Sequence, residues 1–465
     1  MMSAVEIADA VRGRRLRAEA LVDECLARIA RDDPKVNSFV HVDADGARRQ
    51  ARDIDARVAR GEDPGPLAGV PFGVKDMRES VTGMPRRNGS TFDRDNPPDA
   101  SDSVVIARLR AAGAIPVGKV ATAEFGMDGV THTKLCGTTR NPWNLERSPG
   151  GSSGGSASAV SAGLVPFCTA SDAGGSTRCP AGYTGTVGLK PSHGRIPRPD
   201  GFSERGMGGV ITATVADHAR VLDIVSGPDD ADRMSLPAPG ASYEKIIETL
   251  DLRGLKAAYS PDFSFAPVEP QVENVTRAAA HALARAAGLS LSEAPITFTN
   301  VYPHSNRIMV CALLDDLAER GIWPARADEL STGPRWIADR YRNSTPHDLS
   351  VARAQERKLA MEAAQFFREF DVLLSPCHGC TAHPAAGPLA EVIDGRDARD
   401  TNGDPFTMLA NIAWNPSISV PAGVAADGLP VGLLITVRRH RDDVALRLAR
   451  ILELTQAWPR CAPGY

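Results

Sequence analysis

Short apolar runs that alternate with helical stretches constrain the fold of this chain most strongly. From Leu67 onward, runs typical of buried strands occur at 70–74, 115–117 and 164–168. Stretches with helical periodicity, such as 103–112, lie between them. Strands separated by helices favour an α/β fold, with a sheet that is expected to be largely parallel.

The rest of the chain adds further predicted elements. The first 60 residues show helical spacing throughout. More helices are predicted at 271–287, 308–320, 349–370 and 442–454. Strands are predicted at 371–374, 417–421 and 431–437, and a turn at Asp427-Gly428 joins the last two.

The charge balance and the cysteine content argue against several classes of protein. Among 465 residues, 53 are Lys or Arg and 57 are Asp or Glu, and a net charge of −4 disfavours nucleic-acid binding. The longest apolar stretches are too short to span a membrane, and the first residues lack the apolar core of a secretory signal. Eight cysteines are too few for a disulfide scaffold. We therefore expect a cytoplasmic protein with neither a nucleic-acid nor a membrane partner.

Two short motifs have simpler structural explanations than the functions they suggest. Residues 113–120 nearly match a phosphate-binding loop, but Val120 stands where a hydroxyl must bind magnesium, so a helix–turn–strand junction is favoured. Cys377 and Cys380, with His378 between them and His383 following, have the spacing of metal ligands. No second Cys/His pair lies at the usual distance, so a loop after a strand is favoured there.

A third motif leaves an alternative open. Residues 151–155 match G-x-S-x-G, the nucleophile elbow of α/β-hydrolases, with Ser153 as the nucleophile. That mechanism needs a later histidine, and His378, His383 and His440 are available. The four glycines fit an elbow poorly, because an elbow needs only two.

Three segments carry residue types expected of an active site. Lys75, one of only eight lysines, ends an apolar run, where burial would lower its pKa and make it a base. Residues 148–156 are rich in glycine and serine and precede an alanine-rich helix, which favours a tight loop. Small residues before Ser176 leave backbone N–H groups open to an oxyanion. Each segment alone has an ordinary explanation, and only their combination indicates catalysis.

With these segments the chain resembles the amidase signature family. The resemblance rests on the lysine segment 67–76 and on residues 139–143, 150–156, 172–178, 185–190, 415–423 and 428–432. It implies one large α/β domain with a twisted mixed sheet and helices on both faces. Within it we distinguish N-terminal helices (1–60), a signature core (65–195), a variable substrate-pocket region (200–370) and C-terminal strands and a helix (371–465).

The resemblance also implies a mechanism for amide hydrolysis through an acyl-enzyme. Ser176 would be the nucleophile, Ser152, preceded by a cis peptide bond, the proton relay, and Lys75 the base. The backbone N–H groups of Ala173, Gly174, Gly175 and Ser176 would hold the oxyanion. Ser153, Asp172 and Arg178 would organise the loops. No metal or cofactor is required, and activity should rise with pH as Lys75 loses its proton.

The resemblance implies an amide substrate and leaves open whether that amide is linear, aryl or cyclic. Candidate pocket residues are Met127, Asp128, Cys311, Trp323, Trp336 and Trp414. The serious rival is the amidotransferase subunit that releases ammonia from glutamine for misacylated tRNA. Where that branch carries a Met-Gly-Ser-Ser/Thr-Glu-Asn run, this chain has EFGMDGVT at 124–131, which favours a stand-alone amidase. For its assembly we consider a homodimer. A catalytically silent binding subunit is a third hypothesis, disfavoured because all three triad residues are present.

Overall fold

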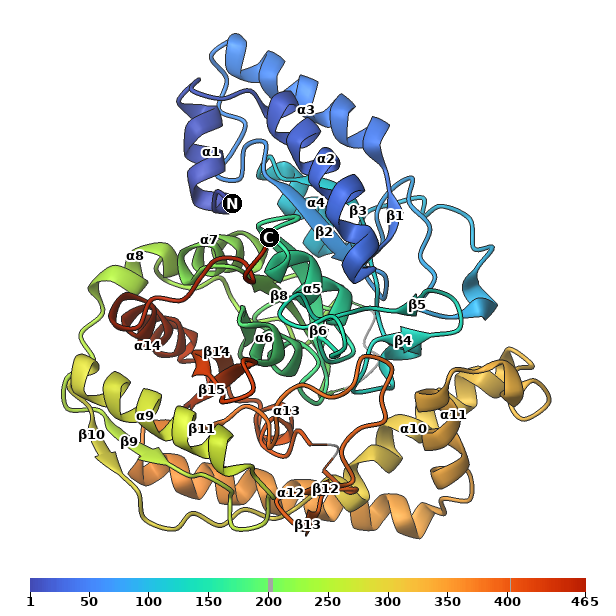
Figure 1. Cartoon of the computed structure of the whole chain (residues 1–465), viewed down its shortest axis with the longest axis vertical. Helices are drawn as coiled ribbons and strands as arrows, with labels where there is room; N and C mark the ends of the chain where they lie inside the picture. Colours follow the sequence, from blue (N-terminus) through green and yellow to red (C-terminus); the bar gives the residue numbers. More distant parts are fainter. Residues whose placement is uncertain (200–203, 402) are drawn as a thin grey trace.

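The main sheet runs through the whole molecule, and its strands come from both halves of the chain (Figure 1). A computed structural model describes residues 1–199, 204–401 and 403–465, so 200–203, which open the predicted variable region, lie outside the described residues. In spatial order the eleven described strands are β1 (Phe39–Val42), β3 (Ile115–Val120), β2 (Pro71–Lys75), β6 (Phe167–Asp172), β8 (Met207–Thr212), β7 (Val187–Lys190), β14 (Ser417–Val424), β15 (Pro430–Val437), β11 (Val372–Pro376), β9 (Lys256–Tyr259) and β10 (Ser290–Ser292).

Helices and short ribbons complete the described part of the chain. The α-helices are α1 (Ala4–Arg12), α2 (Ala18–Val36), α3 (Ala44–Ala59), α4 (Val104–Ala111), α5 (Gly154–Ser161), α6 (Arg178–Thr184), α7 (Val215–Val225), α8 (Tyr243–Thr249), α9 (Pro270–Ala287), α10 (Tyr302–Glu319), α11 (Thr332–Tyr341), α12 (Pro346–Glu369), α13 (Met408–Ile412) and α14 (Asp442–Thr455). Short 3-10 turns are η1 (Thr91–Asp93), η2 (Glu124–Gly126) and η3 (Ala327–Glu329). Two small ribbons pair β4 (His132–Thr133) with β5 (Gly137–Thr138), and β12 (Val392–Ile393) with β13 (Arg396–Asp397). Within the described ranges, no helix combines the length and the apolar character needed to cross a membrane.

The sheet is mixed, so the expectation of a largely parallel sheet holds only at its two flanks. Strands β3, β2 and β6 are parallel, as are β11, β9 and β10. Between these flanks the pairs from β6 to β11 are antiparallel. The physical reason is clearest at β14 and β15, since a short turn between strands forces them to run antiparallel.

One strand lies where only helices were predicted. Residues 39–42 form β1, which pairs with β3 at the edge of the sheet. Four residues between two helices are too few for an alternating pattern to be seen against the helical periodicity on either side.

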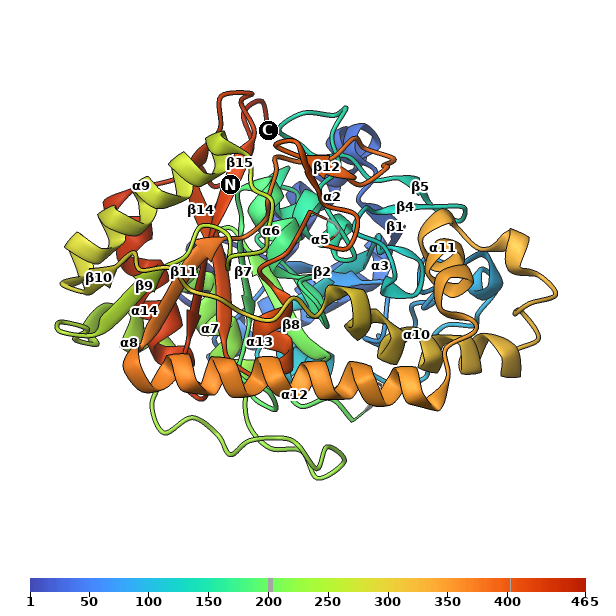
Figure 2. The ribbon, with the colours of Figure 1, turned by 90° about the horizontal axis from the view of Figure 1, so that it is seen from below.

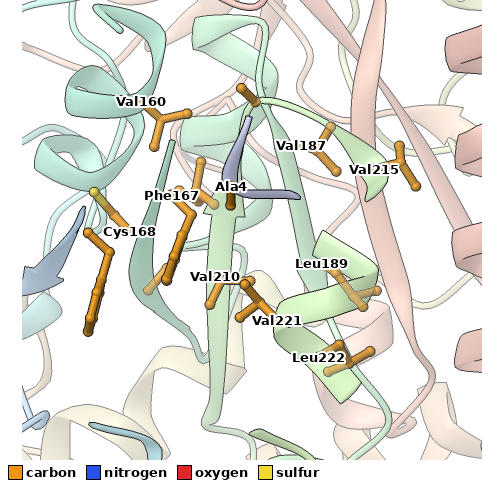
Figure 3. Packing of buried hydrophobic residues seen from close by; sticks show 14 of the residues in the cluster. Ala4, Val160, Phe167, Cys168, Val187, Leu189, Val210, Val215, Val221 and Leu222 are labelled. Carbon is orange, nitrogen blue, oxygen red and sulfur yellow. The ribbon is translucent and has the colours of Figure 1, made fainter. Parts of the chain in front are cut away.

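Helices cover both faces of the sheet, as expected. On β15, Leu433 and Ile435 belong to the main hydrophobic core together with Leu448 of α14. Gly432 points to the opposite face, where a Cβ would lie 2.8 Å from Gly182 of α6. Figure 3 shows part of the main core, in which side chains of the central strands lie near Val221 of α7.

A smaller hydrophobic cluster lies to one side of the sheet. Helices α10 and α11 stand at one end of the molecule, and α12 runs along its lower side (Figure 2). Val310 and Leu313 of α10 and Ile337 of α11 pack there with Met127 from the loop after β3. The predicted variable region thus meets the signature core at Met127.

Candidate active site

Lys75 lies at the end of β2 with its side chain fully buried among hydroxyl groups. Its Nζ lies 2.8 Å from Oγ of Ser152, 2.9 Å from Oγ of Ser153 and 3.0 Å from Oγ of Ser171. Strands β2 and β6 are parallel neighbours, so Lys75 and Ser171, near their carboxyl ends, meet at one edge of the sheet. Ligand sites of open α/β sheets occur at this edge.

The surroundings of Lys75 favour its neutral form. Burial lowers the pKa of Lys75 well below its usual value, and the positive charges of Arg78 and Arg198 lower it further. The nearby carboxylate of Asp172 acts in the opposite direction but does not outweigh burial. A neutral lysine amine has a lone pair and can accept a proton from a neighbouring hydroxyl.

Close packing explains the glycines of the 148–156 loop. A Cβ on Gly151 would lie 2.4 Å from the carbonyl oxygen of Asp128, and one on Gly155 would lie 2.3 Å from the backbone nitrogen of Ala121. Only glycine fits such approaches. The peptide bond between Gly151 and Ser152 is cis, as the family resemblance implies. The segment is therefore a packed loop that places Ser152 beside Lys75.

The loop between β6 and α6 is organised around one carboxylate. Asp172 accepts hydrogen bonds from the backbone N–H groups of Gly175 at 2.8 Å and Thr177 at 3.2 Å. It also forms a 2.9 Å ion pair with Arg178, and both side chains are fully buried. Burial alone would raise the pKa of Asp172, but the charge and hydrogen bonds of Arg178 hold it below its usual value. The carboxylate stays ionised and fixes the backbone on both sides of Ser176.

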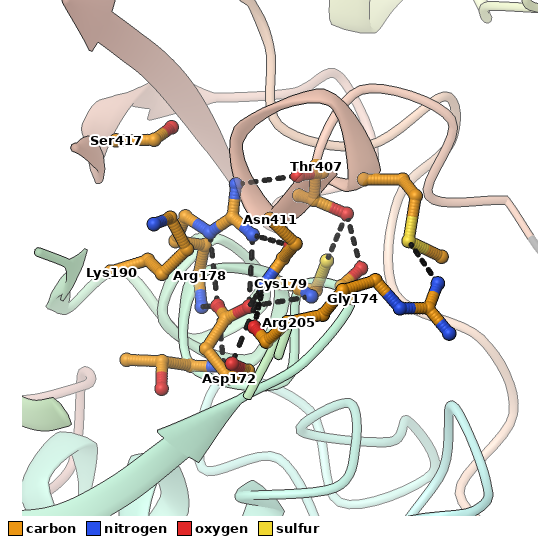
Figure 4. A network of polar contacts seen from close by, with 12 residues as sticks. Asp172, Gly174, Arg178, Cys179, Lys190, Arg205, Thr407, Asn411 and Ser417 are labelled. Carbon is orange, nitrogen blue, oxygen red and sulfur yellow. Dashed lines mark hydrogen bonds and ion pairs between the residues drawn. The ribbon is translucent and has the colours of Figure 1, made fainter. Parts of the chain in front are cut away.

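A second brace reaches this loop from α13 (Figure 4). Asn411 donates from Nδ2 to Oδ1 of Asp172 at 2.9 Å, and its Oδ1 accepts from Arg178 at 2.6 Å. Thr407 accepts from Arg178 at its backbone oxygen and donates from Oγ1 to the carbonyl oxygen of Gly174 at 2.6 Å. The turn that carries Ser176 is thus fixed by residues from a distant part of the sequence.

A small cavity of about 40 Å³ opens between the two serine loops. Ser152, Ser171, Ala173 and Ser176 line it on the side of the sheet. Its other lining residues are Met77, Arg78, Phe125, Gly126, Met127, Asp172, Arg198, Gly206 and Met309. The structure therefore brings Ser152, Ser171 and Ser176 to one pocket, whose outer walls combine apolar side chains with two arginines.

Of the six predicted pocket residues, Met127 is the one that lines this cavity. Asp128 is partly buried beside it and accepts from the backbone N–H of Val130, and desolvation raises the pKa of its carboxyl to about 6. Cys311 is partly buried on α10, and Trp323 packs against the small cluster.

Two tryptophans of that set lie elsewhere. Trp336 is 48% exposed, with the guanidinium of Arg340 over its ring. Trp414 stacks on His193 and lines a different cavity, which Arg438 and His440 also line. The aromatic rings of both residues therefore make surface and packing contacts outside the small cavity.

The structure places the two short motifs in a helix–turn–strand junction and in a loop after a strand. Residues 113–120 form the turn after α4 and strand β3. Cys377 and Cys380 are buried after β11, and among the described residues no group of three or more His, Cys, Asp or Glu side chains is arranged to hold a metal.

The elbow serine has other neighbours than a histidine. In the described part of the chain, Ser153 makes its side-chain hydrogen bonds with Lys75 and Ser171. The ring of His378 stacks on Tyr183 at 4.0 Å, and burial lowers its pKa to about 3. His383 lies 3.3 Å from the hydroxyl of Tyr183. Ser153 therefore belongs to the environment of the lysine.

Several residues of the site were not predicted from the sequence. Ser171 lies on β6, where side chains alternate between the two faces as in any strand. Its position near the carboxyl end of β6, just before the turn that carries Ser176, could have identified it as a site residue. Met309 lies on α10 beside the predicted Cys311, so the helix was found but its inward face was not. Asn411 and Arg198 lie in segments without a distinctive pattern.

Comparisons with known proteins agree with this geometry. The family model described as Amidase matches residues 20–446. An acylamidase from Rhodococcus erythropolis is 35% identical and aligns with 100% of this chain and 97% of its own length. One subunit of the glutamyl-tRNA(Gln) amidotransferase from Roseiflexus sp. (strain RS-1) is 34% identical over 94% of this chain and 93% of its own.

A solved structure extends the likeness to the whole fold. A bacterial aryl acylamidase of the amidase signature family superposes with a TM-score of 0.91 and 27% identity, covering 98% of this chain and 96% of that one. The likeness includes the mixed sheet and the helices on both its faces. The chain therefore belongs to the amidase signature family and is an amide-cleaving hydrolase.

Proposed function

We propose that this amidase hydrolyses a carboxamide through an acyl-enzyme on Ser176, with Ser152 as the proton relay and Lys75 as the base. The observation that carries the proposal is the fully buried Nζ of Lys75, 2.8 Å from Oγ of Ser152. A neutral amine there can accept the Ser152 proton as Ser152 takes the proton of Ser176.

Acylation follows from these positions. Oγ of Ser176 attacks the amide carbon and forms a tetrahedral intermediate. Backbone N–H groups of Ala173, Gly174 and Ser176 hold its oxyanion. The N–H of Gly175 already donates to Asp172, so we assign it to holding the turn in shape.

Collapse of the intermediate breaks the carbon–nitrogen bond. Ser152 gives its proton to the leaving nitrogen and regains one from Lys75, so the amine departs neutral. Water then attacks the ester carbon, with the same relay taking its proton, and the acid is released as Ser176 recovers its hydrogen. Every proton taken in the first half is returned in the second.

The pocket walls favour a stand-alone amidase over the glutamine-dependent subunit. Phe125 and Met127 line the cavity in the segment where that branch carries a polar run. Apolar side chains suit an acyl or aryl group better than the amino acid end of glutamine. Location in the cytoplasm and a homodimer remain predictions; the former is supported by eight unpaired cysteines.

Mass spectrometry of the intact protein after reaction with phenylmethylsulfonyl fluoride tests the proposal. We expect one label on Ser176, none in Ser176→Ala and almost none in Lys75→Ala. Ser156→Ala is the matched control, because Ser156 lies on α5, just after the loop that carries Ser152, but donates to the carbonyl oxygen of Thr169. A label on Ser153 that persists in Lys75→Ala would support the histidine elbow instead, and absence of any label would support a silent binding subunit.

A further inference from the structure

A second cavity lies along the same edge of the sheet as the reactive serines. Its volume is about 500 Å³, within the range of about 300–1,000 Å³ that is typical of small-molecule sites. Arg438, Arg439 and His440, which directly follow β15, line it. Strands β6, β7 and β15 all end at this edge, because β8 runs antiparallel to β6 and β7, and β14 runs antiparallel to β7 and β15. The cavity thus lies where open α/β sheets bind ligands, but it is separate from the Ser176 pocket.

Most of the surface of this cavity is apolar. Phe367 of α12, Ile412 of α13 and Trp414 line it together with three alanines. Helix α12 packs against α13, and both can be followed in Figure 2. One face of the Trp414 ring is covered by His193, which stacks on it at 4.2 Å. An aryl or alkyl group that enters the cavity would therefore leave water for an apolar surface.

Positive charge borders the apolar surface, and no acidic residue accompanies it. The described lining contains two arginines and one histidine but no carboxylate. Arg438 forms a 3.2 Å ion pair with Asp371, which does not line the cavity. Within the described ranges, the exposed guanidinium of Arg439 has no acidic partner. An anionic group bound in the cavity would therefore find one guanidinium available and no repelling carboxylate.

Two residues of the lining have strained backbones. Trp414 and His440 each have φ of 64°, in the left-handed region that is rare for bulky side chains. The conformation of His440 is held from outside the cavity, since its N–H donates to Oγ of Ser192 at 3.0 Å. That hydroxyl in turn donates to Asp442 at 2.7 Å. Strain that neighbouring contacts maintain is concentrated at functional sites, which supports a ligand here.

We propose that this cavity is a second binding site and that its ligand is a carboxylic acid with an aryl or alkyl tail. The tail packs on Trp414 and Ile412, and the carboxylate pairs with Arg439. Guanidinium groups match carboxylates in charge and geometry. Hydrolysis of an amide with an apolar acyl group releases an acid of this class, so the enzyme itself supplies the ligand. The proposal does not depend on which residues carry out the hydrolysis.

Photolabelling with 4-benzoylbenzoate locates the ligand. On irradiation this aryl acid inserts into nearby C–H bonds, and mass spectrometry of the digested protein maps the label. We expect the label on α12 or α13, and an excess of 4-phenylbutyrate should remove it. The neutral analogue 4-(hydroxymethyl)benzophenone should label these helices about tenfold less at the same concentration. Label confined to the Ser176 pocket, at Met77, Met127 or Met309, would overturn the proposal.

Variants test the two groups that hold the acid. The yield of label on α12 and α13 against probe concentration gives a Kd for this cavity alone. Arg439→Met should raise that Kd about tenfold or more, and Arg439→Lys, which keeps the charge, should raise it less. Trp414→Ala should also raise it, because the tail loses its packing surface. Arg233→Met is the matched control, since Arg233 is also exposed but lines a different cavity, of about 290 Å³.

Folding defects are separated by thermal unfolding. Trp414→Ala removes a stacked ring and can lose the fold, whereas Arg439 is exposed and has no partner to lose, so its variants then decide. Equal Kd values for wild type and Arg439→Met would overturn the proposal. Labelling of Ser176 by phenylmethylsulfonyl fluoride is a separate result, so the acyl-enzyme mechanism and the acid site stand or fall independently.

A second copy of the chain is the other occupant that an apolar surface could take. Analytical ultracentrifugation of wild type and Trp414→Ala over a concentration series distinguishes it. We expect the same assembly state in both. A wild-type dimer that dissociates in Trp414→Ala, together with no label on α12 or α13, would show that the cavity is an interface and overturn the acid site.

Discussion

The side-chain amide of Asn411 donates to Oδ1 of Asp172 across 2.9 Å, although 239 residues separate the two in the sequence. The same side chain accepts from Arg178 and donates to the backbone oxygen of Arg205. We expect Asn411→Ala to lower the free energy of unfolding by about 1–3 kcal/mol, because buried polar groups lose their partner. It should also lower kcat about 10–100-fold through displacement of the Ser176 turn.

A neighbouring asparagine separates the two effects. Asn415 is also buried and donates from Nδ2 to the backbone oxygen of Val437 at 2.7 Å. Asn415→Ala should lose comparable stability in urea unfolding and keep its kcat. Equal losses of kcat in both variants would show that Asn411 acts only through overall stability.

Lys75 should lower the free energy of unfolding of the protein although it supports activity. In the unfolded chain a lysine titrates near pH 10.4, and in the folded protein burial moves this pKa well down. Between the two values the unfolded chain binds the extra proton, so the free energy of unfolding rises with pH there. We expect Lys75→Met to be more stable than wild type at neutral pH, by a margin that shrinks by about 1.4 kcal/mol per pH unit across that window. Its activity should fall about 10²–10⁴-fold.

Urea unfolding of both proteins over a pH series measures this margin. Lys358→Met is a control, since Lys358 is exposed on α12 and should change the pH dependence little. A margin that is constant with pH would mean that Lys75 is not held neutral in the folded protein.

The pH dependence of kcat/KM on an uncharged amide should follow the same lysine. Below the lowered pKa of Lys75 the rate rises about tenfold per pH unit with the fraction of free amine, and above it the rate is level. Removing the nearby positive charge in Arg198→Met should raise that pKa and move the rising limb to higher pH. A limb that stays in place would exclude Lys75 as the titrating base.

Substrate size should depend on Met127 and not on Trp336. Met127 lines the small cavity, whereas Trp336 is half exposed at the surface. Met127→Ala should favour longer acyl anilides over acetanilide by about tenfold or more and cost about 2–3 kcal/mol of stability. Trp336→Ala should leave the preference unchanged; a shift of similar size there would place the acyl group along α11 instead.

His378 should be dispensable for chemistry. Its ring is fully buried against Tyr183, and its low pKa keeps it uncharged. His378→Phe retains an aromatic ring for this stack, so kcat should stay within about twofold of wild type. A loss of about 10²-fold or more, with the fold intact by circular dichroism, is the result that a histidine base requires.

The parts of the site that could be predicted share a local cause. Lys75 stands at the end of an apolar run, and Ser152 and Ser176 stand among glycines that close packing demands, so the residues next to each in the sequence form a recognisable pattern. The sequence around Asn411 and Met309 has no such pattern, because their roles come from packing between distant segments. Strand β1 was missed for a related reason, since its four residues are defined by their partner β3.

The same reasoning applies to the sheet. Periodicity identified most of the helices but only six of the eleven described strands of the main sheet, and the direction of pairing depends on which strands become neighbours. The hairpin of β14 and β15 inserts between β7 and β11, so the centre of the sheet is antiparallel. No pattern within either strand specifies that insertion.

The position of that hairpin also separates the parts of the site in time during synthesis. A nascent chain carries Lys75, Ser152 and Ser176 long before it carries α13 and the two strands of the hairpin. Until those segments are made, the sheet has a gap beside β7, and the turn around Ser176 lacks the hydrogen bonds of Thr407 and Asn411. We therefore expect this turn to take its final shape only after β15 has been synthesised.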